Sequence, residues 1–275
     1  TLPRVEAFAD GIDFATISGW NGADPIAAIF TLSPEDKNND TAGVITVTAN
    51  ALVKKTLAAE LPFASSQGFA LCKVNPGDRL LTVLVSPDDS YELMLVSKKG
   101  MAIRFDQQDL RAMGLLAAGV NGMKLKEEDS LAAALVVTEG DTVCFVSSGW
   151  GLGLIPVAEF PKQGRYGQGV IATRLPDDEL MVDAVLPGSG KPLFLLHYGK
   201  GKAQRVRPAM LRPVKRARGL EDTLKMMNQP VRRASLLRLD QAEPEPRRKA
   251  KQRPVADDAG SEQSGAEGGE QYSLF

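Results

Sequence analysis

The sequence predicts an all-β protein built from propeller-like blades, each a four-stranded antiparallel sheet of about 50 residues. Two recurring turns and one recurring acid carry this prediction. The first turn falls at Ala51, Gly100, Gly151 and Gly201, the second at Gly68, Gly119, Gly169 and Gly219, and the acid at Asp78, Asp129 and Glu179. Short apolar runs lie between these markers, as expected for strands joined by hairpins. A single blade cannot cover its own apolar faces, so we expect neighbouring blades to stack.

The repeat divides residues 1–239 into one partial and four whole blades. Residues 1–40 match only the second half of a blade, with 26–32 as its closing strand, so we expect the chain to be truncated before Thr1. The whole blades are 41–90, 91–140, 141–190 and 191–239. In the first three, the runs at 69–74, 120–125 and 170–175 are expected to be strands of their own sheets. The last blade departs from the pattern after Gly219, as terminal repeats often do.

The composition changes at Asp240. Residues 240–275 are rich in Pro, Glu, Gly and Ser, so they cannot bury enough apolar area to fold, and we expect a disordered tail. The tail is basic at 247–253 and acidic at 257–270, and it ends in the apolar peptide QYSLF (271–275).

The chain offers little material for a self-contained active site. It has one histidine, His197, and two cysteines, Cys72 and Cys144, which lie far apart in apolar surroundings. We therefore expect buried thiols and a histidine at the end of a strand, with no catalytic residue, metal site or cofactor in this chain. No apolar run approaches the ~20 residues of a membrane-spanning helix.

Two glycine-rich stretches, 147–155 and 164–169, resemble phosphate-binding loops. Neither precedes a predicted helix, and neither carries the Lys-Ser/Thr pair of a P-loop. Both coincide with turns of the repeat, so we interpret them as hairpin turns.

Charge is distributed unevenly along the chain. The formal net charge is −1, but residues 200–218 carry eight cations and no acid. Such a cluster is typical of a surface that binds a polyanion. Its members are Lys200, Lys202, Arg205, Arg207, Arg212, Lys215, Arg216 and Arg218.

The repeat also places single cations at equivalent positions of successive blades. The strand after the first turn carries a cation in three of the four blades: Lys54 and Lys55, Arg104, and Arg205. In the third blade, Ile155 takes this position. Lys73, Lys124, Arg174 and Lys225 follow the second turn. Equivalent positions lie at one height on the blades, so we expect an exposed basic belt suited to bent duplex DNA. The alternative is that these cations solvate edge strands and prevent edge-to-edge pairing.

The middle of the chain resembles a known family. IRF (103–105), RAMG (111–114) and GVNGMKL (119–125) look like a blade of the C-terminal β-pinwheel found in the A subunit of the type IIA topoisomerases, DNA gyrase and topoisomerase IV. VTANALVKKT (47–56) resembles the preceding blade, and 157–170 the following one. The resemblance covers about residues 1–239. The sequence lacks the family's Gln-Arg-Arg-Gly-Gly-Lys-Gly-like box, so the resemblance does not distinguish gyrase from topoisomerase IV.

This resemblance implies a function in DNA topology. A β-pinwheel of this family binds and bends or wraps duplex DNA, supporting supercoiling or decatenation by an ATP-hydrolysing isomerase. The catalytic tyrosine would lie outside this chain, and ATP and Mg²⁺ would be bound by the B subunit of an A2B2 complex. The resemblance also implies that the protein is located in the cytoplasm, in association with the nucleoid. The alternative is a propeller that binds proteins rather than DNA. The candidate DNA-binding residues are the cluster at 200–218 together with Lys54, Lys55, Lys98, Lys99, Arg104, Lys124, Arg165 and Arg174.

The C-terminal QYSLF also resembles a peptide by which bacterial proteins bind the sliding clamp. Gln271, Leu274 and Phe275 would then be the contact residues, with Tyr272 where the peptide usually has Leu.

Overall fold

The computed structural model describes residues 26–62, 68–188, 192–200, 202–221 and 229–237. These residues lie within one compact unit, Thr1–Asp240, and their regular secondary structure is almost entirely β-strand. A single turn of α-helix, α2 (Pro34–Lys37), is capped at Ser33. None of the helices in the described ranges is long and apolar enough to cross a membrane. The predicted closing strand at 26–32 is wrong, because these residues form no strand. The predicted tail, 240–275, lies outside the described residues.

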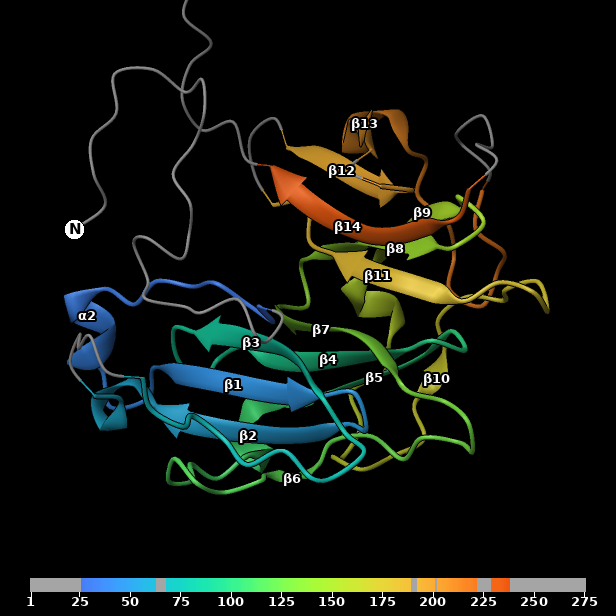
Figure 1. Cartoon of the computed structure of the whole chain (residues 1–275). Coiled ribbons are helices and arrows are strands. Elements are labelled where there is room, and N and C mark those ends of the chain that lie inside the picture. The colour runs from blue at the N-terminus through green and yellow to red at the C-terminus, as the bar shows by residue number, and fades with distance from the viewer. Residues whose placement is uncertain (1–25, 63–67, 189–191, 201, 222–228, 238–275) are drawn as a thin grey trace, which may run out of the picture. The chain divides into compact units, whose positions relative to one another are not determined.

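The strands form four antiparallel sheets, and the all-β prediction is confirmed (Figure 1). The first sheet has the order β3 (Leu80–Ser86), β1 (Gly43–Thr48), β2 (Leu52–Leu57), β6 (Val120–Asn121). The second is β7 (Leu131–Val137), β4 (Glu92–Ser97), β5 (Met101–Asp106), β10 (Val170–Ile171). The third is β11 (Met181–Val185), β8 (Thr142–Ser147), β9 (Leu152–Pro156), and the fourth is β14 (Val231–Leu237), β12 (Leu193–Tyr198), β13 (Lys202–Val206). A 3-10 helix follows the second strand of each blade: η1 (Ala58–Glu60), η2 (Gln107–Asp109), η3 (Val157–Glu159) and η4 (Pro208–Met210).

The fourth strand of a sheet comes from the next blade in the sequence. β6 pairs with β2 of the first blade, and β10 pairs with β5 of the second, so the prediction that these runs belong to their own sheets is wrong. Figure 1 shows β6 beside β2 despite their separation in sequence. Gly119 allows this approach, since it has a φ of +101° and a Cβ there would lie 2.5 Å from the Val53 carbonyl oxygen. The run at 69–74 forms no strand.

Strand register corrects two details of the repeat. Val47 pairs with Val53, Val96 with Ala102 and Val146 with Leu152, so the left-handed turn residues are Ala51, Gly100 and Trp150 rather than Gly151. The equivalent of Lys55 and Arg104 in the third blade is therefore Leu154, not Ile155.

The equivalent of Gly119 and Gly169 in the fourth blade is Leu220 rather than Gly219, because the residue after it, Glu221, bridges to Leu152. A leucine fits here because one glycine lies directly before β9 and another lies within it. A Cβ on Gly151 would lie 2.9 Å from the Leu220 Cβ, and one on Gly153 would lie 2.8 Å from Leu220 Cδ2. At this junction between the third and fourth blades, the glycines lie at β9, the strand that is covered. At the first two junctions, the glycines (Gly119 and Gly169) lie on the segment that covers the strand.

The hydrophobic core lies between neighbouring sheets, as the stacking prediction requires. One cluster joins β1 and β2 to β4 and β5 through residues such as Ile45, Val53 and Phe105. A second joins the second and third sheets, where Phe145 stacks on Phe160 with ring centroids 5.8 Å apart. The third surrounds Trp150 and joins the third and fourth sheets. Each blade is therefore stabilised mainly by its neighbours.

Candidate nucleic-acid interface

Lys54 does not lie on the surface. Its side chain is fully buried, and its ammonium donates hydrogen bonds to the carbonyl oxygens of Leu71 (2.6 Å), Gly114 (2.9 Å) and Leu115 (2.8 Å). Burial lowers the pKa of Lys54, while Cys72 and Glu60 act in the opposite direction. The expectation that Lys54 points outward is wrong: its charge joins the segment after β2 to the segment after β5.

Lys55 and Arg104 are buried as well, so the same expectation is wrong for both. Lys55 forms an ion pair with Asp89. Arg104 Nε lies 3.2 Å from Glu92 Oε2, and the other Glu92 oxygen lies 2.8 Å from Lys162 Nζ. Lys55 neutralises Asp89 in the β3–β4 turn and Arg104 neutralises the buried Glu92, so neither cation is free to bind a polyanion.

The covering segment of the next blade explains this burial. Met113 N donates to the Lys55 carbonyl and Gln163 N to the Arg104 carbonyl, so a neighbouring segment lies over each of these strands. Among the described residues, no such segment pairs with β13, the outer strand of the fourth sheet. Arg205, the equivalent residue there, is exposed. Position in the stack, rather than position in the repeat, decides which cation of this series faces solvent.

The covering segments carry the exposed cations. We define the outer segments as residues 68–79, 110–125, 160–175 and 211–221. Lys73, Lys124 and Arg174 are exposed, each on a different outer segment. Their backbone N–H groups donate to the next outer segment, at the carbonyls of Ala117, Gly167 and Arg218 respectively. Consecutive outer segments are thus hydrogen-bonded to one another beside each cation. Lys225 lies outside the described residues.

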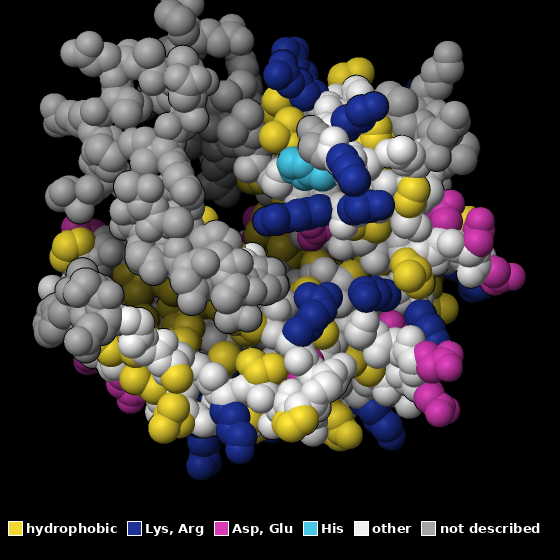
Figure 2. All heavy atoms as spheres, in the orientation of Figure 1, with side chains coloured by type: hydrophobic (Ala, Val, Ile, Leu, Met, Phe, Trp, Pro, Cys, Tyr) yellow, Lys and Arg dark blue, Asp and Glu magenta, His cyan; other side chains and the backbone are white. Residues whose placement is uncertain are grey.

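The cluster at 200–218 is mostly exposed, and its members differ in role. Arg216 is part-buried, with Nε donating to the Glu159 carbonyl (3.0 Å) and Nη1 to the Ile171 carbonyl (3.0 Å). It therefore holds the fourth outer segment to the third blade. The other seven cations are exposed. On the face shown in Figure 2, Lys and Arg side chains gather over β12 and β14, around the histidine.

Three other predicted cations lie elsewhere. Lys98 is half-buried in the β4–β5 turn, and Lys99 beside it is exposed, with Nζ donating to the Glu127 carbonyl. Arg165 is half-buried, and its Nη1 donates to the Asn121 carbonyl at 2.7 Å. Arg165 therefore lies on the outer segments, whereas Lys98 does not.

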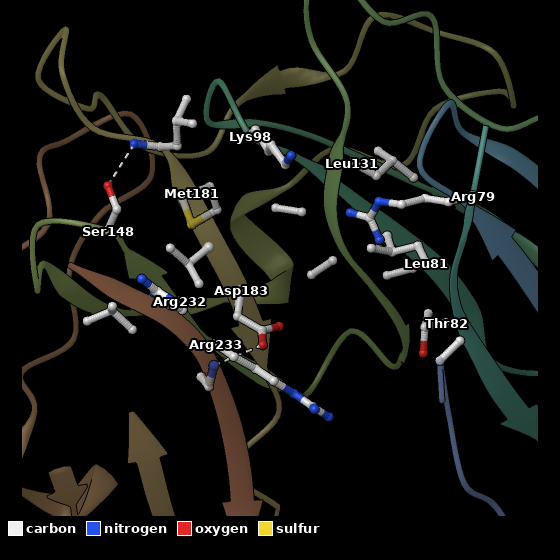
Figure 3. A pocket seen from close by; sticks show the side chains of 18 of the residues that line it. Arg79, Leu81, Thr82, Lys98, Leu131, Ser148, Met181, Asp183, Arg232 and Arg233 are labelled. Carbon is white, nitrogen blue, oxygen red and sulfur yellow. Dashed lines mark hydrogen bonds between the residues drawn. The ribbon is translucent and has the colours of Figure 1, made fainter. Parts of the chain in front are cut away.

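Lys98 lines an inner cavity of about 880 Å³ between β3, β7, β11 and β14, which the sequence reasoning missed. Arg79, Arg232, Arg233 and Asp183 also line it. In Figure 3, Asp183 on β11 lies close to Arg233 on β14, and Arg79 stands on the opposite side of the cavity. Asp183 Oδ2 accepts a hydrogen bond from Ala234 N at 3.1 Å. Burial raises the pKa of Asp183 to about 6, against the opposing effect of this bond.

The remaining candidates behave as structural residues. The stretch 147–155 is the β8–β9 hairpin, and 164–169 lies at a turn with Tyr166 at a φ of +67°. Cys144 is buried, and burial raises its pKa to about 12. His197 Nε2 lies 2.7 Å from Ser235 Oγ. Across the described residues, no group of three His, Cys, Asp or Glu side chains could hold a metal ion.

Comparison with known proteins places this architecture in a known group. Residues 44–87, 91–138 and 154–186 match the family model described as "DNA gyrase C-terminal domain, beta-propeller". The A subunit of DNA gyrase from Mycobacterium bovis is 30% identical over 204 residues, which is 69% of this chain and 24% of that protein. Its counterpart from Escherichia coli is 37% identical over 145 residues, covering 52% of this chain and 16% of that protein. This chain thus spans at most about a quarter of these relatives.

A solved structure shares the fold. The crystal structure of the C-terminal domain of DNA topoisomerase IV superposes with a TM-score of 0.72 at 21% identity, covering 81% of this chain and 69% of that one. At this level of identity the likeness concerns the fold alone.

Proposed function

Since this chain belongs to the family of C-terminal β-propeller domains of DNA gyrase, we propose that it binds and bends duplex DNA for the A subunit of a type II topoisomerase. In that role it would support control of DNA supercoiling or decatenation. The single observation that carries the proposal is the exposure of seven cations within 200–218, a stretch that contains no acid. Phosphates neutralise such a cluster without regard to base sequence.

The outer segments extend the proposed contact surface. Lys124 and Arg174 are exposed on successive outer segments that are hydrogen-bonded to each other. A DNA path along these segments would meet a cation at each blade junction and then reach the cluster on the fourth blade. The buried Lys54, Lys55 and Arg104 take no part in this proposal.

A charge-reversal experiment tests the proposal. Arg205→Glu, Arg212→Glu and Lys215→Glu are combined, because all three side chains are exposed and none of them anchors the fold. We expect duplex affinity to fall about 100-fold at moderate salt, since three phosphate contacts are lost. Lys126→Glu is the matched control, because Lys126 is exposed but adjoins Glu127 and Glu128. Equal affinity of the triple variant and the control would refute the proposal and favour a protein-binding propeller.

Two partners are proposed with the function. The B subunit of the topoisomerase would supply ATP hydrolysis, as in the A2B2 complex that the family resemblance implies. The sliding clamp would bind QYSLF, whose residues Gln271, Leu274 and Phe275 lie outside the described residues. Binding of purified clamp to the wild-type chain but not to a Leu274→Ala, Phe275→Ala variant would support the second partner, and equal binding would refute it.

A further inference from the structure

The outer segments carry exposed apolar side chains at one repeated position. Leu116 is 73% exposed on the second blade and Tyr166 is 49% exposed on the third. Each immediately precedes the residue whose carbonyl accepts the N–H of a neighbouring cation: Ala117 for Lys73 and Gly167 for Lys124. The two positions are therefore equivalent in the repeat, although only Tyr166 has a positive φ, and each places an apolar residue beside an exposed cation of the preceding blade.

The fourth blade has the same backbone without the side chain. Arg218 accepts the N–H of Arg174, and the residue before it is Ala217. Ala217 has a φ of +60° and Tyr166 a φ of +67°, so the two residues share a left-handed conformation. Tyr166 and Ala217 also donate their N–H groups to equivalent carbonyls of the preceding blade, those of Gly122 and Ala172. The third junction thus has an exposed cation, Arg174, but no large apolar side chain at the equivalent position.

Hydrogen bonds anchor the residues directly before Leu116 and Tyr166, whereas these two side chains are exposed to solvent. The buried ammonium of Lys54 fixes the carbonyls of Gly114 and Leu115, directly before Leu116. Arg165 is anchored to the Asn121 carbonyl directly before Tyr166. A tyrosine in the left-handed region is also strained, and such strain persists only where the surroundings enforce it. Rigid, exposed apolar groups beside cations are the elements with which architectural proteins kink a duplex, the cation on phosphate and the apolar group between base steps.

We propose that Leu116 and Tyr166 are apolar wedges that insert at the minor groove of duplex DNA and set where it bends. This inference rests on the proposed function and adds to it: the cations supply affinity, and the two wedges supply deformation at two of the three described junctions. Duplex DNA is favoured over an apolar protein partner because each wedge adjoins an exposed cation.

The test measures bending and affinity separately. A short duplex labelled at both ends reports bending by energy transfer, and fluorescence anisotropy reports affinity. For Leu116→Ala with Tyr166→Ala, we expect most of the protein-induced energy transfer to be lost and affinity for intact duplex to fall about tenfold. A duplex already kinked by a mismatched step should restore the affinity of this variant to within about twofold of wild type.

A gain-of-function variant and a matched control complete the design. Ala217→Tyr should increase energy transfer above wild type, because the Tyr166 backbone shows that this conformation accepts a tyrosine. Ile29→Ala removes an equally exposed apolar side chain (72%) away from the outer segments and should change neither signal. Unchanged bending in both the double alanine variant and Ala217→Tyr, with wild-type affinity, would overturn the wedge proposal while leaving DNA binding intact. Absence of duplex binding by the wild-type chain would instead refute the proposed function.

Discussion

Replacing Lys54 with methionine tests the conclusion that a cation of the repeat became a structural residue. Methionine preserves most of the volume of the stem but donates no hydrogen bond. Three carbonyl oxygens, those of Leu71, Gly114 and Leu115, then lose a donor that lies 2.6–2.9 Å away. The variant therefore separates the packing of the lysine stem from the contribution of its ammonium.

The expected loss of stability follows from opposing terms. Each part-buried carbonyl left without a donor costs about 1–3 kcal/mol. Removing a fully buried ammonium recovers part of this, because its desolvation costs several kcal/mol. We expect a net decrease of about 2–4 kcal/mol in the free energy of unfolding. For a domain of this size, that corresponds to a decrease of about 5–15 °C in Tm.

Urea unfolding followed by tryptophan fluorescence measures this change, with Lys99→Met as the control because Lys99 is exposed. Faster amide hydrogen exchange at 114–118 should accompany the loss, since the ammonium holds that loop. A change below about 0.5 kcal/mol for Lys54→Met, similar to the control, would refute the reasoning.

Three further predictions concern other parts of the fold. The folded-state pKa of Asp183, about 6, lies above its ordinary value of 3.8, so the wild type should lose about 2–3 kcal/mol of stability relative to Asp183→Asn as pH rises from about 4 to about 6. Denaturant midpoints across that range measure the difference, and parallel curves would contradict it. Gly119→Ala should destabilise by about 3 kcal/mol because its Cβ would meet the Val53 carbonyl oxygen, whereas Gly114→Ala, with open space around its Cβ, should be neutral; equal denaturant midpoints would count against the strand exchange. Trp150→Phe removes the donor to the Gln229 carbonyl (2.9 Å) and part of a buried ring, so it should cost at least about 1–2 kcal/mol in urea unfolding followed by circular dichroism, because the variant lacks this fluorophore; an unchanged midpoint would contradict the structural role of Trp150.

The repeat and most of its strands were predictable, because turn residues and apolar runs close together in the sequence determine them. Turn residues with positive φ, such as Ala51 and Gly100, must recur wherever the hairpin recurs. Apolar runs must likewise recur wherever neighbouring sheets share a core. Residue spacing alone therefore predicted an all-β fold of antiparallel sheets that share cores between neighbours.

Strand exchange between blades was not predictable from spacing. A run such as 120–125 has the same pattern whether it pairs with its own sheet or with the preceding one. Gly119 was a usable signal, because a strand-preceding glycine often marks close backbone approach. Its partner, the Val53 carbonyl, is 66 residues earlier in the sequence (119 − 53) and cannot be identified from local pattern.

The exchange also explains the errors in the candidate site. Arg104 and Arg205 occupy the same place in the repeat, yet one is buried under the next outer segment and the other is exposed on an edge strand. The exposed positions on the outer segments, Lys124 and Arg174, were correctly expected to face solvent. Asp183 and the inner cavity were missed, because they depend on which strands line the interior.

The salt dependence of duplex binding tests the central claim most directly. If six to eight of the exposed cations contact phosphate, a plot of log K against log salt concentration should have a slope of about −5 to −7. The Arg205→Glu, Arg212→Glu, Lys215→Glu variant should reduce the magnitude of that slope by about 3. A slope near zero for the wild type, or an identical slope for the variant, would contradict the account.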